Sequence, residues 1–157
     1  MGCMMAISTL YKLKIAQHLA DTFLSAERDG ERARAHLQRS INALEGEGGK
    51  NFKRTKTIGN PVHGMPGGGI ISDLSRPEAV TTFGPSATAA HRLAVRARDV
   101  AVRGMKPSAT RAQLARSGGA VARLLDAAAH RLLHDPQRAG PPTSTGRRPQ
   151  RRRPSPR

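Results

Sequence analysis

Three side chains that could ligate a metal follow one another at intervals of four residues: Asp126, His130 and His134. This spacing places a carboxylate and two imidazoles on one face of a helix, and these groups are common zinc ligands. The segment lacks the glutamate of the zinc protease motif, and Arg131 places a positive charge beside the imidazoles. Imidazoles near the C-terminal end of a helix also complement its dipole. We therefore interpret the group as structural and expect neither a metal nor another cofactor.

Two glycine-rich segments, 46–51 and 64–69, have compositions that invite comparison with phosphate-binding loops. The first has Leu44 and Asn51 where a P-loop requires glycine and a hydroxyl residue, and the second has Pro66 in place of a required glycine. Both segments are therefore expected to be ordinary loops. The sequence also lacks the Gly-x-Ser-x-Gly pattern of a nucleophile elbow, and its few carboxylates fall on predicted solvated faces or in loops. These absences predict a protein that is not an enzyme and has no small-molecule substrate.

Positive charge is the strongest chemical signal in the chain, which carries 27 lysines and arginines against 11 acidic residues. Residues 1–49 are neutral in sum, so the whole excess lies in residues 50–157. Candidate phosphate-binding arginines occur on the predicted helices and in the C-terminal tail: Arg92, Arg96, Arg103, Arg123, Arg147, Arg148, Arg151, Arg152, Arg153 and Arg157. Clustered guanidinium groups bind phosphates and release counterions. Because no aromatic residue interleaves the tail arginines, we expect contact with RNA or DNA with little sequence specificity.

Two alternatives to this interpretation of the charge stay open. Arginine outnumbers lysine 21 to 6 and alanine is abundant, a composition that a G+C-rich coding sequence produces without selection for charge. The chain would then be a regulatory adaptor or accessory protein, such as the product of an overlapping reading frame. A second alternative is a peripheral membrane protein lipidated at Gly2 and Cys3, although Ala6 stands where the acylation pattern has a hydroxyl residue.

A helix-turn-helix is the DNA-binding motif that residues 108–134 most nearly match. Ala115 and Gly119 have the required spacing, and a break at residues 117–119 would form the turn. However, Gly118 occupies a position that is normally bulky, and Val121 and Leu124 take positions that are normally polar. Arg123 and Asp126 would remain as candidate base contacts. A plain helical hairpin is the favoured interpretation.

The best-patterned elements lie in the first third of the chain. Apolar residues recur at helical spacing on both sides of Asp29-Gly30 and predict a helical hairpin over residues 8–45. Its candidate partner-binding face comprises Tyr11, Ile15, Leu19, Phe23, Leu37, Ile41 and Leu44. Because some 40 residues bury too little surface to fold alone, this face must meet the later helices, a second copy of the chain or a protein partner.

The sequence therefore predicts an all-α protein in five segments: a flexible N-terminus (1–7), the helical hairpin (8–45), a disordered Gly/Pro-rich linker (46–85), two or three basic alanine-rich helices (86–135) and a disordered Arg/Pro-rich tail (136–157). Ser155 is a candidate phosphorylation site within that tail. No apolar run is long enough to span a bilayer. We expect an intracellular protein, nuclear or nucleolar in a eukaryotic or viral setting and cytoplasmic otherwise.

Overall fold

The computed structural model describes residues 2–25, 30–54, 58–65 and 68–134, and for residues 2–5 and 22–25 it describes the backbone alone. Within these ranges the chain is all-helical and contains no strand. The helices are α1 (Gly2–Ser25), α2 (Gly30–Glu45), α3 (Ile70–Leu74), α4 (Pro77–Phe83), α5 (Pro85–Gly104) and α6 (Arg111–Leu133). The expected all-α class is thus confirmed, and the tail beyond residue 134 lies outside the described residues.

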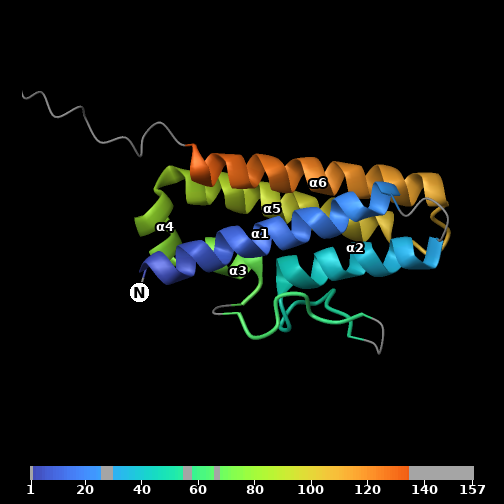
Figure 1. Cartoon of the computed structure of the whole chain (residues 1–157), viewed down its shortest axis with the longest axis horizontal. Coiled ribbons are helices and arrows are strands. Elements are labelled where there is room, and N and C mark those ends of the chain that lie inside the picture. Colours follow the sequence, from blue (N-terminus) through green and yellow to red (C-terminus); the bar gives the residue numbers. More distant parts are fainter. Residues whose placement is uncertain (1, 26–29, 55–57, 66–67, 135–157) are drawn as a thin grey trace, which may run out of the picture.

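The four long helices form an up-down-up-down bundle (Figure 1). Helices α1 and α5 run in one direction, and α2 and α6 run in the other. Helix α6 packs against α5 and α1, while α2 packs on α1 and α5 from the other side. The short helices α3 and α4 lie toward the end of the bundle where α1 begins. This arrangement places α5 and α6, which carry many of the arginines, side by side along one edge.

Helix α1 begins at Gly2, so the expected flexible segment 1–7 is wrong for the residues described. The helix also turns a different face to the core from the one that we predicted. Ile7 and Tyr11 are exposed, whereas Leu13, Ala16 and Ala20 are completely buried. The smaller residues face inward because alanine lets the neighbouring helices approach closely. Ile15 and Leu19 are half-buried, and the side chain of Phe23 lies outside the description.

The second half of the predicted partner-binding face is part of the core of the chain itself. Leu37, Ile41 and Leu44 of α2 are all within 2% of full burial. They pack in one continuous cluster with α1, α5 and α6. These three residues are therefore unavailable to a partner. Of the three possible contacts for the apolar face of the hairpin, the structure shows the one with the later helices.

Residues 46–85, expected to be a disordered linker, instead contain α3 and α4 and a loop tied to α2. The amide of Asn42 donates to the carbonyls of Lys53 (2.7 Å) and Gly59 (3.2 Å), and its oxygen accepts from the Lys53 amide (3.0 Å). The Glu45 carboxylate accepts from both the backbone and the side chain of Asn51, each at 2.7 Å. These side chains satisfy loop backbone groups that composition alone suggested would face water.

The ends of this loop meet where two glycines cross. Gly46 has a φ of 71°, in the left-handed region, and ends α2. A Cβ atom on Gly69 would lie 2.2 Å from the carbonyl carbon of Glu45 and 2.4 Å from the nitrogen of Gly46. Only glycine fits at such a crossing, so the loop leaves and re-enters the bundle at one point.

A buried ion pair fastens α1 to α3. The Lys12 ammonium donates to Asp73 Oδ2 at 2.6 Å and to the carbonyl of Gly68 at 2.8 Å, and the two side chains are 0% and 2% exposed. Asp73 Oδ1 accepts from the Gly68 amide at 2.9 Å. Sequence reasoning missed this pair because a lysine in an amphipathic helix is usually expected to face water.

Helices α5 and α6 are basic alanine-rich helices of the kind predicted for residues 86–135, but the second lacks the predicted break. Residues 111–133 form one uninterrupted helix that passes through Gly118 and Gly119, which rules out a helix-turn-helix there. Both glycines are buried against neighbouring helices. That packing outweighs the cost of glycine in a helix, about 1 kcal/mol per residue. A capping box between Thr110 and Gln113 fixes the start of α6.

Candidate nucleic-acid interface

The register of α5 against α6 decides which arginines lie near one another. A Cβ on Gly104 would lie 2.4 Å from Ser117 Oγ, so these two residues mark the point where the antiparallel helices cross closely. Counting away from this contact, Arg96 lies level with residue 125, and Arg92 lies level with residue 129. Arg123 is two residues from the position level with Arg96, and Arg131 is two residues from the position level with Arg92, which is an offset of about 3 Å along the helix axis in each case.

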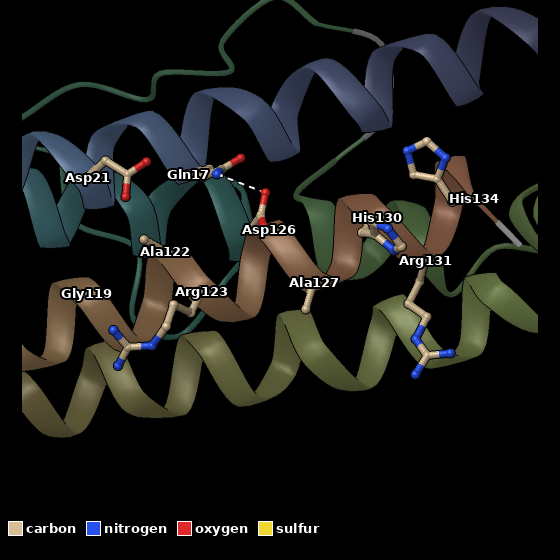
Figure 2. Close-up of a pocket in the computed structure, with 10 residues that line it drawn as sticks. All are labelled: Gln17, Asp21, Gly119, Ala122, Arg123, Asp126, Ala127, His130, Arg131 and His134. Atoms are coloured by element: carbon tan, nitrogen blue, oxygen red, sulfur yellow. Dashed lines mark hydrogen bonds between the residues drawn. The ribbon is translucent and has the colours of Figure 1, made fainter.

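The outer face of this helix pair presents six exposed arginines, which we call the arginine strip: Arg92, Arg96, Arg103, Arg116, Arg123 and Arg131. Figure 2 shows Arg123 and Arg131 directed away from α1, toward the side of the olive-green α5. At 1.5 Å per residue, the strip extends about 16 Å along α5 and about 22 Å along α6. None of the six side chains forms a hydrogen bond or an ion pair with another residue that the structure describes.

Other cations of the bundle are used to hold it together. Arg98 lies 3.8 Å from Glu45 Oε1 and 2.7 Å from Asp99 Oδ1. Arg34 donates to three backbone carbonyls in the turn before α6. Lys12 is buried with Asp73. The strip differs from these cations because its six side chains are exposed and form no ion pair with another described residue.

Few acidic groups lie near the strip. Residues 85–134 contain nine lysines and arginines and two acids, Asp99 and Asp126. Asp99 is paired with Arg98, and Asp126 accepts from the Gln17 amide at 3.2 Å across the α1–α6 groove. Asp21 and Asp126 line the same groove as Arg123 and Arg131, but cations outnumber acids nine to two in this segment, and this excess favours a polyanion.

A groove of about 880 Å³ runs between α1 and α6 and is lined in part by Arg123 and Arg131 of the strip (Figure 2). Gln17 and Asp21 line it from α1 and Asp126 lines it from α6, so two carboxylates share the groove with two arginines of the strip. The rings of His130 and His134 stand 4.6 Å apart, centre to centre. Among the described residues, no group of three His, Cys, Asp or Glu side chains could hold a metal ion.

Burial and nearby charges shift two titratable groups. The pKa of His36 is lowered below its ordinary value of 6.5, chiefly because burial disfavours the charged ring and then because of Arg39, Arg32 and His18. Hydrogen bonds from Asn60 and His63 lower the pKa of the exposed Glu47 carboxyl. Neither group belongs to the strip.

The structure brings together four of the arginines singled out in the sequence: Arg92, Arg96, Arg103 and Arg123. It adds Arg116 and Arg131, which sequence reasoning missed because the supposed break near residue 118 obscured their common face. The remaining predicted positions, Arg147, Arg148, Arg151, Arg152, Arg153, Arg157 and Ser155, lie outside the described residues. Gly2 and Cys3 belong to the first turn of α1.

No described helix is both long enough and apolar enough to cross a membrane. Comparisons with known proteins yield no match to this chain, whether against protein-family models, curated proteins or solved structures.

Proposed function

We propose that this protein is a non-enzymatic nucleic acid-binding protein that contacts the phosphate backbone through the arginine strip. The observation that supports the proposal is that six exposed arginines of the neighbouring helices α5 and α6 form no ion pair with another described residue, whereas other cations of the bundle are used for internal contacts. A single strand of a B-form duplex carries one charge per about 3.4 Å of axis, so a strip of about 20 Å matches about six phosphates.

Sequence specificity should be low. Residues 85–134 contain no Phe, Tyr or Trp on which a base could stack. Arginine contacts to phosphate position a nucleic acid without identifying its bases. Binding of this kind also fits the expected intracellular location, nuclear or nucleolar in a eukaryotic or viral setting and cytoplasmic otherwise.

The test is the salt dependence of affinity for fluorescein-labelled 20-base-pair DNA and RNA duplexes of random sequence, measured by anisotropy. Each phosphate contact contributes about 0.9 to the slope of log K against log salt concentration. The triple variant R92Q/R96Q/R123Q should therefore reduce the slope by about 2.7. A chain lacking residues 137–157 measures the contribution of the tail separately.

A matched control neutralises three exposed cations outside the strip: Lys14, Lys50 and Arg54. K14Q/K50Q/R54Q changes the net charge by the same amount and should leave most of the slope intact. Equal losses in the two triple variants would show that overall charge, and not this face, governs binding. Absent or salt-independent binding by the full chain would overturn the proposal.

A second candidate function is self-association or adaptor binding through α1. Ile7 and Tyr11, one helical turn apart, are 63% and 60% exposed. A face of this kind on one helix suits contact with another protein surface. If it joins two copies of the chain, sedimentation will show a dimer that Tyr11→Ser dissociates, whereas a monomer at all concentrations would reject self-association.

A further inference from the structure

The arginine strip ends in a pocket at the turn between α5 and α6. The cavity measures about 570 Å³ and is lined by three cationic residues, Arg103, Lys106 and Arg116. Ser108, Gln113 and Ser117 add hydroxyl and amide groups to the wall. None of the described residues that line it is acidic. Three cationic residues thus surround one cavity.

The crossing of two helices brings two of these cations together. Because Gly104 has no side chain, the backbone of α5 approaches Ser117 to a distance at which a Cβ would collide with the Ser117 side chain. Arg103 and Arg116 each adjoin one of these residues in sequence, and both line the cavity. The same contact that packs the helices therefore sets the spacing of the backbone positions that carry Arg103 and Arg116.

The turn that supplies Lys106 and Ser108 is held in place from behind. The Arg34 guanidinium donates to the carbonyls of Lys106 and Pro107 at 3.1 Å and to that of Ala109 at 3.0 Å. These carbonyls are thereby occupied, and their partial negative charge is offset by a fourth cation. Gln113 is also fixed, because its Oε1 accepts from the Thr110 amide at 2.8 Å. Because these bonds already fix the turn and Gln113, this part of the pocket loses little conformational entropy when it binds an anion.

We infer that this pocket binds a phosphomonoester. Such a group carries about −1.5 to −2 charges at neutral pH and offers three acceptor oxygens, whereas a backbone diester carries one charge and continues on both sides. Three convergent cations and neutral donors match the monoester. The source of the ligand rests on the proposed function: a nucleic-acid strand that lies along the strip would place its terminal phosphate in this pocket.

Inorganic phosphate is the first probe, because it needs no nucleic acid. In ¹⁵N-labelled protein at pH 7.5 and constant ionic strength, phosphate titrated against chloride should shift the amides of Ser108 and Ser117 saturably. Arg116→Gln should abolish the shift. Arg123→Gln removes an equal charge from the same helix outside the pocket and should preserve it.

The second probe compares 20-nucleotide strands that differ only in carrying a 5′-phosphate, a 3′-phosphate or hydroxyl ends. A phosphorylated end should bind about tenfold more tightly, the effect of one charge-assisted hydrogen bond. Arg116→Gln should remove this preference, and Arg123→Gln should weaken all strands alike. Phosphate shifts without an end preference would identify a phosphorylated ligand other than a strand end as the source.

The two proposals fail in different ways. If phosphate causes no saturable shift and the strand ends bind alike, the pocket is not a phosphomonoester site, even where salt-dependent binding of duplexes persists. If phosphate binds but no nucleic acid does, the pocket is a phosphomonoester site and the proposed nucleic-acid function is wrong.

Discussion

Removing the carboxylate from the buried Lys12–Asp73 pair should destabilise the bundle severely. In Asp73→Asn the side chain keeps its shape, and its oxygen can still accept from the Gly68 amide. The Lys12 ammonium, which is 0% exposed, loses the carboxylate that lies 2.6 Å away. Breaking a buried pair by removing one partner costs about 3–5 kcal/mol, because an uncompensated charge stays inside.

That loss is a large part of the stability of a domain, which is about 5–15 kcal/mol. For a chain of this size it corresponds to a fall in Tm of about 10–15 °C. Urea unfolding followed by circular dichroism at 222 nm gives the free energy of unfolding directly. Asp99→Asn is the matched control, because Asp99 is 48% exposed and its pair with Arg98 should contribute at most about 1 kcal/mol.

The double variant K12M/D73N separates burial of charge from loss of shape. Methionine replaces the aliphatic stem of the lysine without its charge, so the double variant should recover most of the loss caused by Asp73→Asn. A coupling free energy of about 2–3 kcal/mol is expected for groups in direct contact. If Asp73→Asn alone costs less than about 1 kcal/mol, the pair behaves as a surface pair and the reasoning from burial is refuted.

Two further predictions concern the loop and α2. Gly69→Ala should destabilise the fold by about 1–3 kcal/mol or more, because its Cβ would collide with the backbone of Glu45. Gly59→Ala is the control, since nothing lies within 4 Å of its Cβ, and it should be neutral or slightly stabilising. Equal unfolding midpoints for the two variants would contradict the close approach of Gly69 to Glu45. His36 has a lowered pKa in the folded state, so the unfolded state binds the proton more tightly and stability is lost as the pH falls through about 6.5 and below. His36→Gln should lose less stability than the parent between pH 7.5 and 5.5, and parallel pH profiles would contradict this assignment.

Helical periodicity predicted the helical class and the hairpin, and alanine-rich helices were expected over residues 86–135. These are local properties, since Ala90, Ala94, Ala97 and Ala101 recur at the helical spacing whatever they pack against. The cationic face of Arg92, Arg96 and Arg103 follows from the same periodicity. The strip was therefore partly predictable before its partner helix was known.

The errors arose where tertiary contacts outweigh local preference. Gly118 and Gly119 indicated a break, but the packing of α6 against its neighbours keeps the helix continuous. Residues 46–69 looked disordered because the side-chain amides that hold them belong to Gln38 and Asn42 of α2, 11 to 17 positions away in the sequence, a pairing that composition does not reveal. The pocket at the α5–α6 turn depends on Gly104 meeting Ser117, a contact that neither segment reveals alone.

The buried stripe of α5 bears on whether base composition alone produced this sequence. Ala87, Ala90, Ala94, Ala97 and Ala101 are completely buried. Each alanine codon becomes a valine codon by one transition at its second position, and a larger side chain there would push two closely packed helices apart. Nucleotide drift would introduce such changes at these five sites as readily as at exposed alanines. A deficit of valine variants at the buried sites in natural populations would therefore record selection on the fold itself, independently of any selection on charge.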